Sequence, residues 1–283
     1  WVYPTSLALP DGSSLSTWGL APNGWSPATV PGPTLIASQG EELLIVVRST
    51  LPEAVALSFP GQNLVPDMVG VVPNPSIGFG ERRYTFTVDK PGTYIYEAGF
   101  TANSARQTAA GMYGTLIVRP AAPFQAYEDV GSAYTDEAVL VFSEVDVELF
   151  NDRTGFELTG YAPEFRLVNG LAYNQVPSIP VTPGSTLLLR MVNAGIEERS
   201  IGVLGLNMTQ IATNGSRLPF DYGFFARPMG AGATMDVLVK IPANVPVGTK
   251  YPVINTAMQQ LHNDGALAGD GSVAFGGAIT FIE

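Results

Sequence analysis

Short runs of apolar residues, many of them alternating with polar ones, recur along the whole chain and predict β-strands. The runs are rich in Val, Ile, Leu, Thr and Tyr, and include EELLIVVRS, RRYTFTVDKPGTYIYEA, GTLIVRP, AVLVFSEVDVEL, STLLLRMVNA, TMDVLVKIP and GGAITFIE. The 31 Gly and 23 Pro residues punctuate these runs, and no long helical period stands out between them. The pattern predicts an all-β protein of packed sandwiches rather than alternating strand and helix units.

The strand pattern occurs twice. VPGPTLIASQGEELLIVVRSTLP and VPSIPVTPGSTLLLRMVNAGIEE superpose at a constant offset of 144 residues, which relates Pro33 to Pro177, Gly40 to Gly184 and Gly61 to Gly205. MYGTLIV and FGGAITFI then close the two copies as similar final strands. The repeat predicts a duplicated Greek-key β-sandwich.

The domain limits follow from a change in composition. RPAAPFQAYEDVGSAYTDEA replaces the alternation with Pro, Ala and acidic residues. We therefore expect a first domain at residues 1–121, a linker at 122–129 and a second domain at 130–283. The two domains are expected to pack through the long strands that carry Val46 and Leu188.

Charge and hydropathy narrow the classes of partner. The 283 residues include 25 acidic and 14 basic side chains, a net charge of -11, so binding to nucleic acid is not expected. No apolar run reaches the ~18 residues of a membrane span, so membrane insertion is not expected either. The chain opens at Trp1 without a signal-type segment, and we expect a mature, exported form that is secreted, periplasmic or cell-surface. It contains no Cys.

Six phrases in succession carry a family resemblance. VPGPTLIASQGEELLIVVRSTLP, PGTYIYEAG, GMYGTLIVRP, AVLVFSEVD, FRLVNGLAYN and LLLRMVNAG resemble the first two cupredoxin domains of the multicopper oxidase family, over nearly the whole chain. The resemblance implies two cupredoxin-like Greek-key β-sandwich domains. Members of that family carry His-x-His-Gly after the first long strand and His-x-His after the Gly-Thr-Tyr turn, and these histidines hold part of a trinuclear copper cluster. The four matching positions here are Ser58, Pro60, Glu97 and Gly99.

These four positions predict a vestigial copper site. Copper oxidases use imidazole ligands, and among the four side chains Glu97 alone could coordinate a metal. A blue-copper centre also requires a thiolate, and the chain ends in FGGAITFIE without the family's His-Cys-His phrase. We expect no catalytic residue, no cofactor-binding residue and no metal, with copper as the alternative cofactor.

The loss of four ligand side chains leaves space at the predicted vestigial site, and we expect particular residues or water to occupy it. We expect the space to be filled by Phe59, Phe100 and Gln107, or to remain as a polar cavity. A buried Glu97 carboxylate requires a partner, and Arg106 or water is the expected one.

Three further groups of residues allow two interpretations each. His262, the single histidine, is either a loop residue beside an Asn-Asp-Gly turn or a copper ligand, the latter with three copies around a trimer axis. In SEVDVE, a strand would place Glu144, Asp146 and Glu148 on one face, which is either solvated or a site for a hard cation such as Ca²⁺. The aromatic stretch LPFDYGFFARPMG is either a plug between domains or a surface for a partner.

Three functional hypotheses follow. The first is a copper-free, multicopper-oxidase-like exported protein with a binding, scaffolding or assembly role. The second is an oxidoreductase of the multicopper oxidase type, with copper at an interface or at a site completed by a partner. The third is a small-molecule binding module that uses the vacated cleft between the domains. Because two-domain relatives close into head-to-tail rings, we also expect a homotrimer, and a further protein partner is compatible with all three hypotheses.

Overall fold

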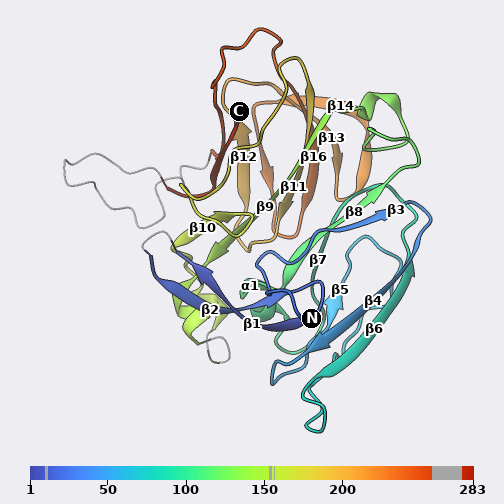
Figure 1. The fold of residues 1–283 in the computed structure, drawn as a ribbon, viewed down its shortest axis with the longest axis vertical. Coiled ribbons are helices and arrows are strands. Elements are labelled where there is room, and N and C mark those ends of the chain that lie inside the picture. The colour runs from blue at the N-terminus through green and yellow to red at the C-terminus, as the bar shows by residue number, and fades with distance from the viewer. Residues whose placement is uncertain (10–11, 153–154, 156, 257–275) are drawn as a thin grey trace, which may run out of the picture.

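The first half of the chain forms two four-stranded sheets (Figure 1). The computed structural model describes residues 1–9, 12–152, 155, 157–256 and 276–283. One sheet has the order β2-β1-β4-β6 and the other β3-β8-β7-β5. The strands are β1 (Val2–Ala8), β2 (Ser14–Leu20), β3 (Leu35–Ser38), β4 (Glu42–Ser49), β5 (Leu57–Ser58), β6 (Gly80–Thr87), β7 (Gly92–Ala98) and β8 (Tyr113–Arg119), with helix α1 (Ser104–Ala109) between β7 and β8.

The second half forms a six-stranded sheet, β10-β9-β11-β16-β13-β14, and a four-stranded sheet, β15-β12-β17-β18. Its strands are β9 (Asp136–Val145), β10 (Phe165–Val168), β11 (Thr186–Asn193), β12 (Arg199–Val203), β13 (Met208–Thr213), β14 (Ser216–Phe224), β15 (Ala226–Met229), β16 (Thr234–Lys240), β17 (Tyr251–Asn255) and β18 (Ile279–Ile282), with helix α2 (Val147–Asn151) after β9. Short 3-10 turns occupy Val130–Ser132 and Leu158–Gly160. None of the helices described has the length and hydropathy to cross a membrane.

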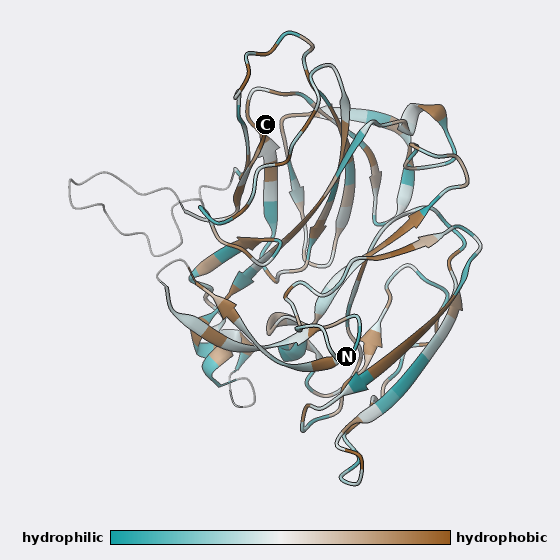
Figure 2. Ribbon diagram, viewed as in Figure 1, coloured by the Kyte–Doolittle hydropathy of each residue, from teal (hydrophilic) through white to brown (hydrophobic). Residues whose placement is uncertain are grey.

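Each half has its own apolar core between its two sheets. Phe59, Tyr84 and Tyr96 are buried in the first core, and Phe142 and Met191 in the second. Figure 2 shows β4 as mainly hydrophobic and its antiparallel neighbour β6 as mainly hydrophilic, yet both contribute to the first core, through Val47 in β4 and Tyr84 and Phe86 in β6. The predicted all-β fold of two cupredoxin-like sandwiches is confirmed. The limits of the predicted domains and linker stay predictions.

The repeat found in the sequence is also a repeat of backbone structure. The bounds of β4 and β11 differ by 144 residues at both ends, so the two strands are equivalent. Each follows a glycine with φ of 82°, Gly40 in one half and Gly184 in the other. The edge pairing is repeated too, because Leu35 pairs in parallel with Leu116 and Ile179 with Ile282.

The two halves pack through β7, which contacts β11 and β16. The expectation that β4 lies at this junction is wrong: β4 pairs with β1 and β6, and Val46 is half-buried there. Leu188 does belong to a strand at the junction, but it packs in a cluster with Tyr127 and Tyr134. The sequence repeat made β4 and β11 look alike, although only β11 is buried along nearly its whole length.

A buried polar network crosses the junction. The Thr93 hydroxyl in β7 donates to Asp236 Oδ1 at 2.6 Å and accepts from Arg190 Nη1 at 3.0 Å. Arg190 also donates to Glu137 at 2.7 Å, and the Thr234 hydroxyl donates to the Thr93 carbonyl at 2.7 Å. Buried charges of this kind are satisfied only in one geometry, so the network fixes how the halves meet.

Candidate functional site

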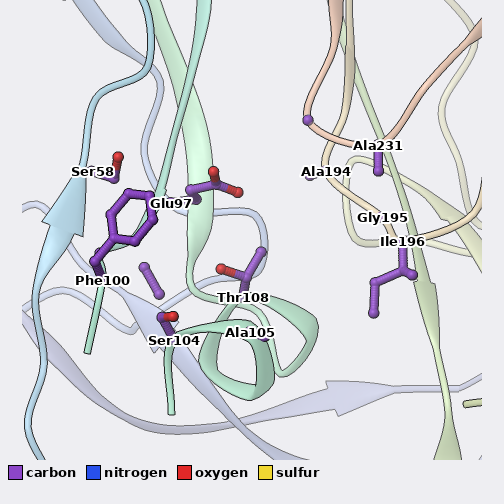
Figure 3. Close-up of a pocket in the computed structure, with 13 residues that line it drawn as sticks. Ser58, Glu97, Phe100, Ser104, Ala105, Thr108, Ala194, Gly195, Ile196 and Ala231 are labelled. Carbon is purple, nitrogen blue, oxygen red and sulfur yellow. The ribbon is translucent and has the colours of Figure 1, made fainter. Parts of the chain in front are cut away.

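A cavity of about 350 Å³ lies at the junction, beside the end of β7 (Figure 3). Its two walls come from the two halves of the chain. The near wall consists of Ser58, Glu97, Ala98, Gly99, Phe100, Ser104, Ala105 and Thr108, and the far wall of Ala194, Gly195, Ile196, Ala231 and Gly232.

Strand pairing places the near wall. Ser58 in β5 lies opposite Glu97 in β7, which lies opposite Tyr113 in β8 on its other side. Gly99 follows directly and donates its N–H to the Ala56 carbonyl at 2.9 Å. Three of the four predicted vestigial positions, Ser58, Glu97 and Gly99, are therefore brought together in one cavity.

The fourth position faces elsewhere. Pro60 is exposed and lines a neighbouring cavity of about 230 Å³ together with Ile95 and Gly232. The turn at Gly61, with φ of 83°, carries the chain away from the larger cavity after Pro60.

The Glu97 carboxylate is the one ionisable group among the described lining residues. No hydrogen bond or ion pair from a described residue reaches it. Burial alone raises the pKa of this carboxyl above its ordinary value. In Figure 3 the side chain points into the space between the two walls.

The expected partnership between Glu97 and Arg106 is wrong. Arg106 Nη1 donates to Asn103 Oδ1 at 3.5 Å, and Arg106 Nη2 lies 3.9 Å from Glu157. Arg106 lies on α1, so nine residues of separation do not bring it to the face of β7 that carries Glu97.

The three residues that were expected to refill the site do not fill it. Phe100 lines the cavity and is 63% exposed. Phe59 points the other way and packs against Phe86 at a ring separation of 4.9 Å in the first core. The Gln107 amide donates to Glu53 and to the Ala54 carbonyl. The cavity therefore stays open, but its lining combines one carboxylate and three hydroxyls with mainly apolar residues, whereas the alternative expectation was a polar cavity.

The far wall is held by Asn193, which the sequence analysis did not single out, and by Glu144. The Asn193 amide accepts from Gly195 N–H and donates to the carbonyls of Glu197 and Met229, at 3.2, 2.8 and 3.0 Å. Its own carbonyl accepts from Gly232 N–H at 2.8 Å. Asn193 thus joins the two loops of the far wall into one unit. In the sequence, a polar Asn at the end of a strongly apolar run was the one feature that could have pointed to this role.

Glu144 supports the same wall from behind. Its carboxylate accepts from the N–H groups of Ile196 and Glu197 and from buried Arg199. A Cβ at position 195 would lie 1.9 Å from Glu144 Oε2, so glycine is required there. The expected strand face of Glu144, Asp146 and Glu148 does not form, because β9 ends at Val145 and the Asp146 side chain caps α2.

Those three carboxylates therefore differ in role. Glu144 and Asp146 are 3% and 2% exposed, while Glu148 lies exposed on α2, so neither a solvated face nor a shared cation site results. Asp146 accepts from Leu149 N–H and Ala162 N–H. His262 lies outside the described residues.

The aromatic stretch is a surface rather than a plug. Phe220, Tyr222 and Phe225 are 87%, 55% and 78% exposed. They lie on or beside β14 and β15, which are edge strands of the two sheets of the second half. Arg227 lies over the Tyr222 ring at 5.0 Å.

The residues of the cavity do not fit copper. They supply one carboxylate and no imidazole, and among the described residues no group of three or more His, Cys, Asp or Glu could hold a metal. A Cβ at position 99 would lie 2.8 Å from the Ala56 Cβ, so even a histidine there would require Ala56 to shift.

Comparison with known proteins shows what this chain resembles in sequence and in fold. The family model described as multicopper oxidase matches residues 23–123. Putative laccase-11 of Oryza sativa subsp. japonica is 26% identical over 240 residues, covering 79% of this chain and 43% of its own length. Copper resistance protein A of Pseudomonas syringae pv. tomato is 25% identical over 286 residues, covering 82% of this chain and 44% of its own. The chain thus spans less than half the length of both relatives.

The fold is shared with solved structures. A blue copper oxidase from Nitrosomonas europaea superposes with a TM-score of 0.81 at 19% identity, over all of this chain and 83% of that one. The first part of this chain is thus similar in sequence to multicopper oxidases, and the whole chain shares the cupredoxin fold of solved multicopper oxidase structures.

Proposed function

We propose that this chain is a multicopper-oxidase-like binding protein, in which the cavity beside Glu97 takes a small molecule where relatives would be expected to hold copper. The observation that carries the proposal is the Glu97 carboxylate, which lies in a cavity of about 350 Å³ with no partner among the described residues. Small-molecule sites are concave, mostly apolar and contain a few polar groups, and they favour junctions between domains.

The donor set supports binding over oxidation. Oxygen reduction on copper requires a set of imidazoles, and the cavity offers one carboxylate with the hydroxyls of Ser58, Ser104 and Thr108. These groups can accept and donate hydrogen bonds to an organic ligand without a metal.

A copper-loading experiment tests this proposal. Purified protein is incubated with excess Cu(II), desalted and measured for bound copper and for oxygen uptake with a phenolic substrate. We expect well below one copper per chain and no oxygen uptake, with Glu97→Gln as the matched variant that should behave like the wild type. Stoichiometric copper together with oxygen uptake that Glu97→Gln removes would restore the oxidoreductase hypothesis.

Self-assembly is a second role that one observation favours. The exposed aromatic residues Phe220, Tyr222 and Phe225 form an apolar patch on the edge strands of the second half. We take Val65, Met68, Val69 and Ile77, which are exposed residues in the segment between β5 and β6 of the first half, as the second patch. Two different patches on the two halves are what a closed head-to-tail ring needs. The homotrimer and the export of the chain stay predictions.

A further inference from the structure

The charge of Glu97 has no counterpart within the described part of the chain. The arginines near the junction are engaged elsewhere: Arg199 with Glu144, Arg166 with Glu197, and Arg190 with Glu137 and Asp236. The described residues that line the cavity include no Lys or Arg. A carboxylate removed from bulk water is stabilised by hydrogen bonds or an opposite charge, and none of the described residues supplies either to Glu97.

We propose that the cavity binds a small organic cation whose ammonium group is held by the Glu97 carboxylate and lies against the Phe100 ring. This assignment rests on the proposed binding function and names the class of its ligand. Phe100 and Glu97 line the same cavity, and Figure 3 shows both side chains on the same wall, so we place the ammonium between the carboxylate and the ring. A carboxylate beside an exposed aromatic ring is a suitable pair for an ammonium, through a charge-assisted hydrogen bond and a cation–π contact.

The rest of the lining suits the carbon skeleton of such a ligand. Ala98, Ala105, Ala194, Ala231 and Ile196 present methyl and methylene groups, and the hydroxyls of Ser104 and Thr108 lie on the same side as Glu97. A hard divalent cation would need six or more oxygen ligands, which these residues do not supply. The cavity is at the small end of ligand sites, so a fragment-sized amine is the expected occupant.

The net charge of the chain also favours a cationic ligand. The chain carries a net charge of -11, so cations are attracted to it and anions are repelled. Ionic strength should therefore weaken binding of a cation while leaving binding of a neutral isostere almost unchanged.

The test compares isosteric probes on the full chain. Benzylammonium, benzyl alcohol and benzoate are titrated into the purified protein, and dissociation constants are measured by protein-observed NMR. Three variants accompany the wild type: Glu97→Gln, which removes the charge at constant shape; Phe100→Leu, which removes the ring; and Glu42→Gln, which removes a charge from an exposed position on β4.

We expect benzylammonium to bind at least tenfold more tightly than benzyl alcohol, and benzoate not to bind. Glu97→Gln should weaken benzylammonium at least tenfold while leaving benzyl alcohol within twofold. Phe100→Leu should weaken benzylammonium about two- to fivefold, the range of an exposed cation–π contact. Glu42→Gln should change neither probe.

The failures of the two proposals are distinguishable. If benzyl alcohol binds as tightly as benzylammonium, or if Glu97→Gln leaves benzylammonium unchanged, the cation assignment is overturned while the binding function stands. Should none of the probes bind to folded protein that retains copper and takes up oxygen, the proposed function itself is wrong. Native far-ultraviolet circular dichroism of each variant confirms that the fold is retained.

Discussion

Glu97 and Glu144 lie near the same cavity in opposite environments. Glu144 accepts hydrogen bonds from two backbone N–H groups and from Arg199, so its charge is compensated although it is 3% exposed. Glu97 receives nothing from the described residues, and burial raises the pKa of its carboxyl. Compensation by partners makes Glu144 a structural residue, and the lack of a partner among the described residues is the reason why we propose Glu97 as the ligand-binding one.

Replacing Glu97 by Gln should stabilise the free protein at neutral pH. The folded-state pKa is raised above its ordinary value of 4.5, so the folded state holds more protons than the unfolded state between the two pKa values. The free energy of unfolding therefore falls as the pH rises through that window, by about 1.4 kcal/mol for each pH unit that separates the two values.

Urea unfolding of wild type and Glu97→Gln at pH 7 and pH 4 measures this difference. The stabilisation by Glu97→Gln should be present at pH 7 and nearly absent at pH 4, where both states are largely protonated at this position. Glu42→Gln, on an exposed residue, is the control. Equal stability of Glu97→Gln and wild type at pH 7 would contradict the unpartnered carboxylate.

At the scale of elements, local pattern predicted the strands well and their junctions poorly. The apolar run at 42–49 and its repeat at 186–193 became β4 and β11, because continuous apolar residues after a glycine turn have few other stable conformations. The predicted strand face of Glu144, Asp146 and Glu148 was wrong, because in the sequence an aspartate that caps a helix cannot be told from a polar position of an alternating strand.

The sequence predicted one wall of the candidate site and missed the other, because only the first wall is marked by a local motif. Ser58, Glu97 and Gly99 could be found from the family phrases, and strand pairing did bring them together. The far wall could not be found, because Gly195 and Gly232 are about 100 residues or more from Glu97 and no local motif marks them. The wrong pairing of Glu97 with Arg106 came from sequence proximity alone.

The two loops of the far wall should loosen together when Asn193 is replaced. Asn193→Ala removes three side-chain hydrogen bonds, to Gly195, Glu197 and Met229, and should lower the free energy of unfolding by about 2–4 kcal/mol. Hydrogen exchange should accelerate in residues 194–197 and 229–232 alike. Asn74→Ala, which removes one bond from an exposed loop, is the control. Faster hydrogen exchange in only one of the two loops would contradict the claim that Asn193 holds both.

At the scale of the whole molecule, exposed apolar surface predicts association. Light scattering should give three times the chain mass of 29.9 kDa at micromolar concentration. Phe225→Ser and Tyr222→Ser, on the exposed patch, should shift the mass towards the monomer without changing the fold. Substitution of exposed Val247, which lies outside both patches, should leave the mass unchanged. A monomeric wild type would end the prediction of a ring.

Gly40 and Gly184 occupy equivalent positions in the two halves, so substituting each in turn tests whether the halves unfold together. Both have φ of 82°. A Cβ added at Gly40 would have no atom within 4 Å, and a Cβ added at Gly184 would lie 3.5 Å from Ala243, which is an ordinary van der Waals contact. Gly40→Ala and Gly184→Ala should each cost about 1–2 kcal/mol, chiefly in backbone conformation. Because the Thr93, Asp236 and Arg190 network joins the halves, we expect one calorimetric transition, displaced equally by either substitution. Two transitions, each responding to only one of the glycines, would mean that the halves unfold independently and that the cavity loses one wall at the lower of the two melting temperatures.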